Sequence, residues 1–297
     1  MSVVIETRGL TRRYGSTTAV DAVDLRIEEN GIHGLLGRNG AGKTTLMSLL
    51  TGQEFATAGE IRVFGEPPLE NAAVLGRTCF IKEAQKYPDE FKAKHVLRSA
   101  ERFFPNWDAD FAAELVKDFR LPLDRRMKKL SRGQFSAVGV IVGLAARAPI
   151  TYFDEPYLGL DAVARQLFYD RLLADYAEHP RTVVLSTHLI DEVADLLEHV
   201  IVIDEGRILL DESAEALRGR AVNVVGPAEA AEAFARGRDV LHRDRIGGLA
   251  SITITGVDEA DRRAAAAAGL ELGPVSLQQM IVRMTSGRPD ELQEQLS

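Results

Sequence analysis

Short apolar runs and helical patterns alternate along the first two thirds of the chain. Residues 3–10 alternate apolar and polar side chains, which predicts a strand with one face buried. The runs 182–186 and 199–203 are short and largely apolar, which also favours strands, and helical patterns separate these runs. The alternation predicts an α/β domain over residues 1–212.

Between about residues 87 and 147 the pattern is helical. Six apolar residues spaced through this region, five of them aromatic, are interpreted as a packing core: Phe103, Phe104, Trp107, Phe111, Leu115 and Phe119. Asp108 or Asn106 is a candidate cap for the helix that runs to Phe119. We therefore predict a helical subdomain over about 87–147.

The pattern changes again beyond a boundary near residues 213–219. Strand patterns at 221–225, 240–246 and 250–255 alternate with helical patterns, and Gly269 is a candidate C-cap of the last helix. This order predicts a small C-terminal α+β accessory domain over residues 219–297.

The clearest candidate for chemistry is a glycine-rich loop between a strand pattern and a helix pattern. It fits G-x-x-x-x-G-K-[ST] at every required position, and it consists of Gly37, Arg38, Asn39, Gly40, Ala41, Gly42, Lys43 and Thr44, with Thr45 beginning the helical run. Glycines allow backbone N–H groups to surround a phosphate chain, and the start of the helix adds a positive dipole end. Lys43 supplies a charge for the β- and γ-phosphates, and the Thr44 hydroxyl is a Mg²⁺ ligand.

A second candidate is the strand at 150–156, which ends in two adjacent acids. Glycine-loop nucleotidases place an acid at such a strand end to hold Mg²⁺, and this would be Asp154. An acid beside it is suited to orienting a water for attack, and this would be Glu155. A surface acid pair is the alternative for a single strand, but the loop in the same chain favours the catalytic interpretation.

Three further features are weak when taken alone. Ser131 and Gln134 have the spacing of a capping box before an apolar run, and Gly133 in the same first turn makes it a possible anion site. Tyr14 precedes a glycine turn and is either a half-exposed turn residue or a platform for a base. His188 follows a strand, where a lone histidine is more often structural than catalytic.

Composition limits the function classes. The chain has 297 residues and a net charge of −8, which argues against a nucleic-acid binder that acts through bulk charge. A single cysteine, Cys79, excludes a disulfide framework and makes a reducing cytoplasm the simplest location. No apolar run is long enough to span a bilayer and the N-terminus has no signal-peptide pattern, so any membrane-spanning part is expected from a partner chain.

Together these motifs resemble the ATP-binding subunit of an ABC transporter over about residues 3–211. Gly37 to Thr44 corresponds to the Walker A loop, and Asp154 and Glu155 correspond to the Walker B acid and the catalytic glutamate. Residues 130–134, Leu-Ser-Arg-Gly-Gln, resemble the signature LSGGQ with Arg132 in place of the first glycine. By position, the resemblance assigns Gln85 to the Q-loop, Asp161 to the D-loop, His188 to the switch histidine and Tyr14 to adenine stacking.

The resemblance implies a P-loop NTPase fold of the ABC type, with a mixed sheet core, an antiparallel β subdomain, an α-helical subdomain and a small C-terminal α/β domain. It implies ATP and Mg²⁺ as cofactors, with Mg²⁺ held by Thr44, Asp154 and Gln85, and catalysis by Glu155, His188 and Gln85. Two ATPase chains, as a homodimer or heterodimer, would pair head to tail. Each nucleotide would then meet Ser131, Gly133, Gln134 and Asp161 of the opposite chain.

The expected partner is an integral membrane permease, without nucleic acid, and the expected location is the cytoplasm, peripheral on the inner face of the cell membrane. Residues 276–281 resemble the segment that closes many drug- and polysaccharide-export ATPases, which favours an exporter. The alternatives are a soluble ABC-type ATPase in translation or DNA repair, a GTPase, and a non-enzymatic ATP sensor. The single ATPase unit argues against the soluble ATPase, and the absence of an Asn-Lys-x-Asp motif argues against the GTPase. The presence of Glu155 argues against the non-enzymatic sensor.

Arg132 has two possible roles in this scheme. Its side chain either turns outward to join the basic run at 125–129, or reaches the nucleotide or Asp161 of the opposite chain.

Overall fold

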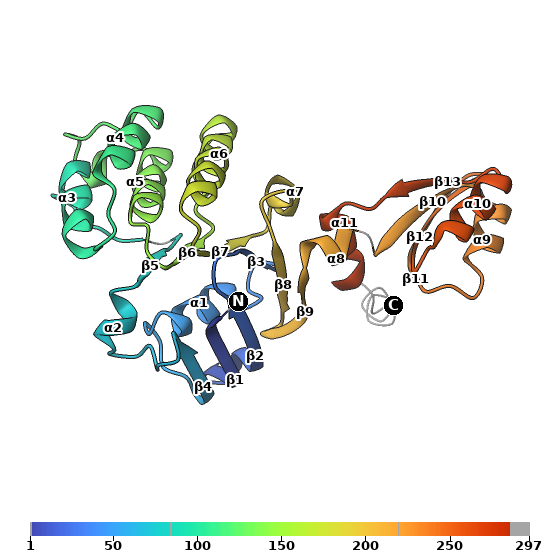
Figure 1. Ribbon diagram of the computed structural model, residues 1–297, viewed down its shortest axis with the longest axis horizontal. Coiled ribbons are helices and arrows are strands. Elements are labelled where there is room, and N and C mark those ends of the chain that lie inside the picture. The colour runs from blue at the N-terminus through green and yellow to red at the C-terminus, as the bar shows by residue number, and fades with distance from the viewer. Residues whose placement is uncertain (1, 84, 219, 286–297) are drawn as a thin grey trace. The chain divides into compact units, whose positions relative to one another are not determined.

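The computed structural model describes residues 2–83, 85–218 and 220–285 (Figure 1). The chain divides into two compact units. Unit 1 runs to His188 and resumes over Leu196–Asp211, and unit 2 consists of Leu189–Asp195 and the chain from Glu212 onward.

The centre of unit 1 is a six-stranded sheet with the order β5-β6-β7-β3-β8-β9. Its strands are β3 (Ile32–Leu36), β5 (Thr78–Ile81), β6 (Ile150–Asp154), β7 (Thr182–Thr187), β8 (His199–Asp204) and β9 (Arg207–Ser213). The pairs from β5 to β8 are parallel. Every residue of β3, β6 and β7 is buried, as expected of parallel strands covered on both faces. The parallel order brings the ends of β3, β6 and β7 to one edge of the sheet.

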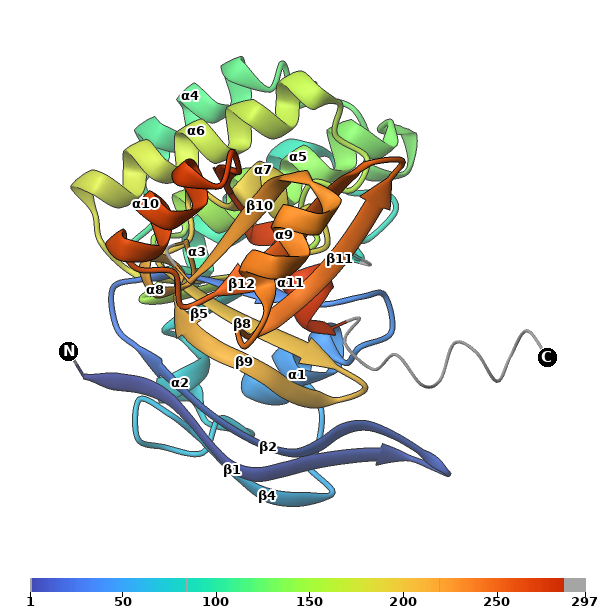
Figure 2. The same cartoon turned by 90° about the vertical axis from the view of Figure 1, so that its right-hand side faces the viewer.

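A second, antiparallel sheet has the order β2-β1-β4, with β1 (Val3–Tyr14), β2 (Thr17–Glu28) and β4 (Ala58–Val63), side by side in Figure 2. One apolar core joins this sheet, the central sheet and helix α1 (Lys43–Leu50). It includes Ile5 and Leu10 of β1, Leu46 and Met47 of α1, and Tyr152 of β6. The helix that follows the glycine loop is therefore fixed on both sides.

The helical part of unit 1 contains α2 (Ala72–Leu75), α3 (Ala93–Phe103), α4 (Ala109–Asp118), the 3₁₀ turn η1 (Met127–Lys129), α5 (Arg132–Ala145) and α6 (Ala162–Glu178). Asp108 caps α4, because its Oδ1 accepts a hydrogen bond from the Phe111 amide at 2.8 Å. Helix α5 contacts α3, α4, α6 and the strands β5 and β6.

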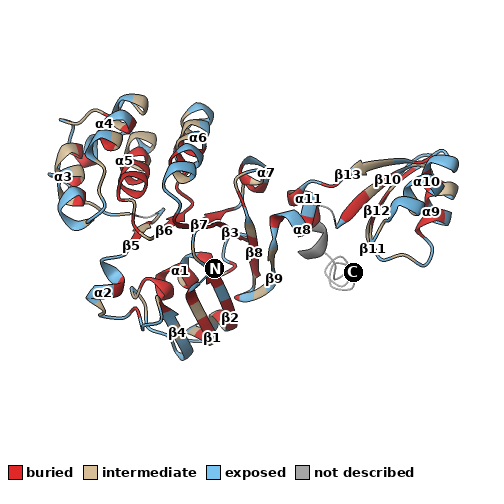
Figure 3. Cartoon of the chain, viewed as in Figure 1, coloured by how far each residue is buried: buried red, intermediate tan, exposed pale blue. Residues whose placement is uncertain are grey.

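The interpretation of the aromatic positions as the core of this region is wrong in part. Leu115 is buried, but Phe103 is 77% exposed. The core comes mainly from α5, whose residues Val138, Ile141 and Leu144 are fully enclosed (Figure 3). The physical reason is that α5 lies among several elements, so its small and aliphatic side chains are surrounded, whereas α3 has an outer face.

Cys79 of β5 is 2% exposed. Burial raises the pKa of its thiol to about 12, so the group stays protonated in the folded chain.

Unit 2 contains α7 (Ile190–Val193), α8 (Ala214–Arg218), β10 (Ala221–Pro227), α9 (Ala228–Ala235), β11 (Val240–Ile246), β12 (Leu249–Thr255), α10 (Glu259–Ala267), β13 (Glu271–Pro274) and α11 (Leu277–Thr285). Its sheet has the order β11-β12-β10-β13 with antiparallel pairing throughout. The element order β-α-β-β-α-β with this strand order is the ferredoxin-like arrangement. Its core contains Val224 and Ile252 of the sheet, Phe234 of α9 and Ala265 of α10, so both helices cover one face of the sheet.

The short helix α7 follows His188 directly but belongs to unit 2. It contacts α11, and the Arg218 guanidinium donates a hydrogen bond of 2.5 Å to the carbonyl of Ala194. The described residues of the predicted accessory domain thus pack with a segment from the middle of the sequence. Residues 286–297 of that predicted domain lie outside the described residues.

A chain that ends at Arg218 is expected to stay folded and to bind ATP with the affinity of the full chain. The reason is that the glycine loop and the core around α1 lie in unit 1. The measurements are circular dichroism and titration with a fluorescent ATP analogue. A chain that ends at Thr187 is the control and is expected to aggregate, since it lacks β8, which pairs with β3. Aggregation of both chains would show that the two units cannot fold separately.

Candidate functional site

The glycine loop connects β3 to α1, and two of its glycines are required by close packing. Gly42 has φ +109°, and a Cβ there would lie 2.3 Å from the Ala19 carbonyl oxygen. A Cβ at Gly37 would lie 2.2 Å from the Ile203 carbonyl oxygen. Any other residue at either position would displace the backbone. The loop therefore has a fixed course between β2, β8 and the first turn of α1.

Lys43, in the first turn of α1, is held against its own loop. Its Nζ donates hydrogen bonds to the carbonyl oxygens of Gly37 at 2.8 Å and Arg38 at 3.1 Å. The same atom lies 3.6 Å from Oε1 of Glu155. Both side chains are more than nine-tenths buried, so each charge depends on the other. An entering polyphosphate would have to supply Lys43 with replacement partners.

Thr44 and Asp154 meet at the same edge of the sheet. The Thr44 hydroxyl donates a hydrogen bond of 2.7 Å to Oδ2 of Asp154. The other oxygen, Oδ1, is buried and accepts no hydrogen bond from the described residues. A hydroxyl oxygen and a carboxylate oxygen that accepts no hydrogen bond are ligands of the type that Mg²⁺ prefers. Within the described part of the chain, no group of three or more His, Cys, Asp or Glu side chains could hold a metal ion.

Glu155 and His188, to which the resemblance assigned catalytic roles, lie in contact. Nδ1 of His188 lies 2.8 Å from Oε2 of Glu155, and the Tyr157 hydroxyl donates to the same oxygen. Glu155 has φ +50°, a left-handed conformation for a residue other than glycine. Such a backbone costs about 1–3 kcal/mol, and it aims the side chain of Glu155 at Lys43 instead of continuing the direction of β6.

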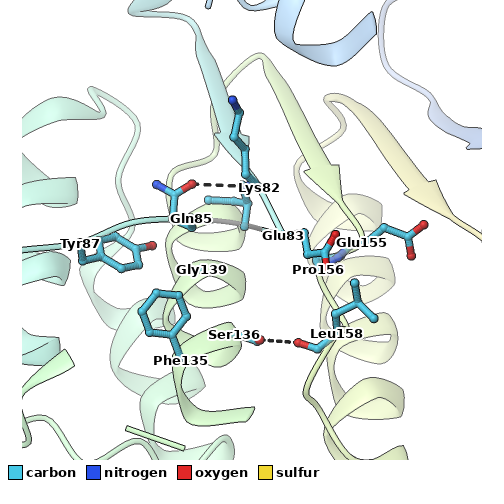
Figure 4. Close-up of a pocket in the computed structure, with 11 residues that line it drawn as sticks. Lys82, Glu83, Gln85, Tyr87, Phe135, Ser136, Gly139, Glu155, Pro156 and Leu158 are labelled. Carbon is cyan, nitrogen blue, oxygen red and sulfur yellow. Dashed lines mark hydrogen bonds between the residues drawn. The ribbon is translucent and has the colours of Figure 1, made fainter. Parts of the chain in front are cut away.

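Gln85 lies in the same region but is not directed at this site. It lines a pocket together with Glu155, yet its Oε1 accepts a hydrogen bond of 3.4 Å from the Lys82 amide (Figure 4). Glu83 lies nearer to Glu155 in this pocket and points toward Pro156 (Figure 4). The paired register of β5 and β6 ends at Ile81 and Phe153, so Glu83 and Gln85 both lie beyond the strand. A role for Gln85 as a metal ligand stays a prediction.

The residues predicted to face a second chain cap their own helices here. Ser131 Oγ accepts from the Gln134 amide and Gln134 Oε1 accepts from the Ser131 amide, each at 3.2 Å, which completes the predicted capping box of α5. Asp161 caps α6 through a 2.8 Å hydrogen bond from the Ala164 amide. A Cβ at Gly133 would lie 2.7 Å from the Gly159 carbonyl oxygen, so the starts of both helices are packed closely. Contact with an opposite nucleotide stays a prediction for these residues.

Arg132 is exposed, and its stem lies across Gly159. A Cβ at Gly159 would be 2.5 Å from Cγ of Arg132, and Gly159 has φ +93°. Arg132, which replaces the first glycine of the signature, therefore packs against Gly159 of the same chain. The aliphatic part of Arg132 covers the turn that leads from Glu155 to Asp161.

Tyr14 lies at the end of β1 and is 43% exposed. The guanidinium carbon of Arg12 lies 4.4 Å from the centroid of its ring. A cation against one face of the ring leaves the other face as the surface on which a base would stack. Adenine stacking on Tyr14 stays a prediction.

Two residues of the site were missed in the sequence. Tyr157 is 1% exposed and its hydroxyl contacts both Glu155 and His188. The signal was present, since a hydroxyl-bearing aromatic lies two residues after the predicted base. Glu83 belongs to the run 78–85, which the sequence predicts as a buried strand that ends in polar residues, whereas β5 ends at Ile81.

The fold and the site define a P-loop nucleotide-binding protein. A parallel sheet presents a glycine loop, a lysine at the start of a helix, and an acid pair at the end of a neighbouring strand. In the described residues, no helix is long and apolar enough to cross a membrane.

Comparison with known proteins identifies the class further. The family model "ABC transporter" matches residues 20–158. The Nod factor export ATP-binding protein I of Paraburkholderia xenovorans is 32% identical over 72% of this chain and 72% of its own length. The aliphatic sulfonates import ATP-binding protein SsuB 1 of Nocardia farcinica is also 32% identical, over 73% of this chain and 85% of its own length. The solved dimeric structure of a bacterial ABC transporter cassette superposes with a TM-score of 0.62 at 23% identity, over 71% of this chain and 98% of that one.

The chain therefore belongs to the ABC transporter family as an ATP-binding subunit. The predicted ABC ATPase fold is confirmed, with a parallel core sheet and an antiparallel subdomain.

Lys43→Ala is expected to weaken ATP binding at least ~10-fold, because a charge-assisted hydrogen bond contributes about 1.5–3 kcal/mol. The variant also leaves the Glu155 carboxylate buried without its cation. Isothermal titration with ATP measures the loss, and Lys117→Ala, an exposed lysine of α4, is the control. Equal affinity of the Lys43→Ala variant and the parent would remove Lys43 from the phosphate site.

Proposed function

We propose that this chain hydrolyses ATP to power an exporter, as one of two ATPase subunits docked on a separate membrane permease at the inner face of the cell membrane. The observation that carries the hydrolytic part is the set of contacts around Glu155. A buried carboxylate faces Lys43 with one oxygen and His188 with the other, at the edge of the sheet where Thr44 meets Asp154.

Mg²⁺ fits the residues at this edge. The Thr44 hydroxyl and, through water, Asp154 would hold it, and the buried Oδ1 of Asp154 gives it an acceptor in reserve. Gln85 is the predicted further ligand, although its amide would have to leave Lys82 first. When bound, Mg²⁺ would neutralise charge on the β- and γ-phosphates.

The contacts of Lys43 suggest how nucleotide binding prepares the base. Its ammonium group would exchange the carbonyls of Gly37 and Arg38 for phosphate oxygens. This would leave Oε1 of Glu155 free to accept a proton from the attacking water. The water oxygen then bonds to the γ-phosphorus as the bond to the bridging oxygen breaks, and that oxygen leaves with ADP. Nδ1 of His188 contacts Glu155, so a hydrogen bond from this residue to the γ-phosphate would have to come from a protonated Nε2.

A head-to-tail dimer is proposed because the two sets of predicted nucleotide contacts lie on different elements of one chain. The glycine loop precedes α1, whereas the signature residues lie at the start of α5. The starts of α5 and α6 are capped, close together and partly exposed, so they form a compact surface for an opposite nucleotide. A solved structure of similar fold is dimeric, which supports the pairing of two ATPase chains.

Docking on a permease is proposed for the helical part of unit 1. Phe103 at the end of α3 is 77% exposed and Phe91 is 38% exposed, and exposed aromatic side chains favour a protein partner. The two reported relatives are named for opposite directions of transport. Export is favoured here by the resemblance of residues 276–281 to the end of export ATPases.

Glu155→Gln is expected to bind ATP but to hydrolyse it at least ~100-fold more slowly, which is the usual range for loss of a positioned base. The variant should collect as an ATP-bound dimer on size exclusion. Phosphate release and elution volume are the measurements. Glu178→Gln, the same chemical change at an exposed site of α6, serves as the control. Hydrolysis at the parent rate by the Glu155→Gln variant would refute the proposed role of Glu155.

Arg132→Gly in the Glu155→Gln background separates the two roles of Arg132. If its charge contacts the opposite chain, dimerisation should weaken by ~1.5–3 kcal/mol, the value of a charge-assisted contact. Arg132→Leu keeps the stem over Gly159 and removes the charge, so it should weaken the dimer equally. Sedimentation with ATP gives the dimer constant. Weaker dimerisation of the Arg132→Gly variant alone would assign the effect to the aliphatic stem. Unchanged dimerisation of both variants would exclude a contact of Arg132 with the opposite chain.

A further inference from the structure

Tyr157 lies in the turn between β6 and α6, and its hydroxyl is placed at the centre of the catalytic contacts. The hydroxyl donates to Oε2 of Glu155. It accepts hydrogen bonds from the Thr187 hydroxyl at 2.9 Å and from the His188 amide at 3.2 Å. The ring also packs edge-on against the His188 imidazole, with 5.8 Å between centroids. One side chain thus touches the predicted base and the predicted switch residue.

The direction of each hydrogen bond follows from the chemistry of the groups. A carboxylate only accepts, so the phenolic proton points to Glu155, and the two lone pairs of the phenolic oxygen are used by Thr187 and the His188 amide. Nδ1 of His188, 3.1 Å from that oxygen and 2.8 Å from Oε2, must therefore carry its proton toward Glu155. Burial and the contact with Glu155 raise the pKa of Tyr157 above its ordinary value, which keeps the phenol protonated as a donor.

These contacts make the two oxygens of Glu155 unequal. Oε2 receives hydrogen bonds from both Tyr157 and His188. Oε1 is buried, accepts no hydrogen bond from the described residues and faces only the Lys43 ammonium at 3.6 Å. The oxygen that Lys43 releases on binding phosphate is thus the one without another partner.

We infer that Tyr157 is a positioning residue for hydrolysis: its hydroxyl anchors Oε2 of Glu155 and the main chain at His188, so that Oε1 alone takes the proton of the attacking water. This rests on the proposed hydrolytic role of Glu155. The left-handed backbone of Glu155, φ +50°, supports the inference, since a strained side-chain direction needs a fixed anchor to persist. Tyr157 itself exchanges no proton with water or phosphate.

The alternative is that Tyr157 only fills space, and Tyr152 offers a matched control. Tyr152 is the other tyrosine of this strand and turn, 0% exposed, and its hydroxyl is buried without a hydrogen-bond partner among the described residues. Tyr152→Phe and Tyr157→Phe remove the same atom from equally buried rings. Only the second removes a contact with Glu155.

The experiment compares ATP hydrolysis by the full chain and its variants. Tyr157→Phe should lower kcat ~10- to 100-fold, since a displacement of about 1 Å at a reacting group costs as much as 10²-fold. Its dissociation constant for a non-hydrolysable ATP analogue should stay that of the parent. Tyr152→Phe should change neither quantity.

Thr187→Val provides a second test if Tyr157→Phe folds poorly. It keeps the phenol but removes one hydrogen bond that orients it, so kcat should fall less than in the Tyr157→Phe variant, and the dissociation constant for the analogue should again stay that of the parent. A parent kcat in the Tyr157→Phe variant, or equal losses in both Phe variants, would overturn the positioning role. A parent that does not depend on Glu155 for turnover would instead refute the proposed function on which the role rests.

Discussion

The structure of the site depends on how the charge of the buried Lys43 ammonium group is compensated. A buried ammonium group must be paired or hydrogen-bonded, and here two loop carbonyls and Oε1 of Glu155 meet that need. This constraint connects the loop after β3 with the acid after β6, across the intervening strand β7. The loop is also held closely by its neighbours, because a Cβ at Gly37 or Gly42 would meet the carbonyl oxygen of Ile203 or Ala19. The same pairing gives the buried carboxylate of Glu155 a cation at 3.6 Å.

The elements that carry the site were predictable because each is defined by a local pattern. The loop, the acid pair and the cap of α5 depend on residues a few positions apart, and the structure brings Lys43, Thr44, Asp154, Glu155 and His188 to one edge of the sheet. The interpretation that was wrong in part, the aromatic core of the helical region, depended on contacts between residues far apart in the sequence. The spacing of the aromatic residues in the helical region is compatible with a core. Which of them face solvent depends on how the other helices pack around α5. Gln85 was assigned by resemblance, and its Oε1 accepts a hydrogen bond from the Lys82 amide here, so its role as a metal ligand stays a prediction.

Tyr157 shows a different limit of sequence analysis. Its spacing from Glu155 is visible, but its contacts with Thr187 and His188 join residues 30 and 31 positions apart. The ferredoxin-like arrangement of unit 2 has the same origin. Its strands and helices follow from local alternation, yet the strand order β11-β12-β10-β13 is a property of pairing, which periodicity alone does not specify. The membership of α7 in unit 2 likewise had no local signal.

The enclosed thiol of β5 has a practical consequence for studying this chain. Cys79 is the sole cysteine, it is 2% exposed, and its pKa near 12 leaves almost no thiolate at neutral pH. Maleimide and disulfide reagents attack thiolates that they can reach. The native chain is therefore a silent background for such reagents, and a single cysteine introduced on its surface would accept a fluorophore or spin label selectively. Distances within and between the two units could then be followed by spectroscopy without first removing the native residue.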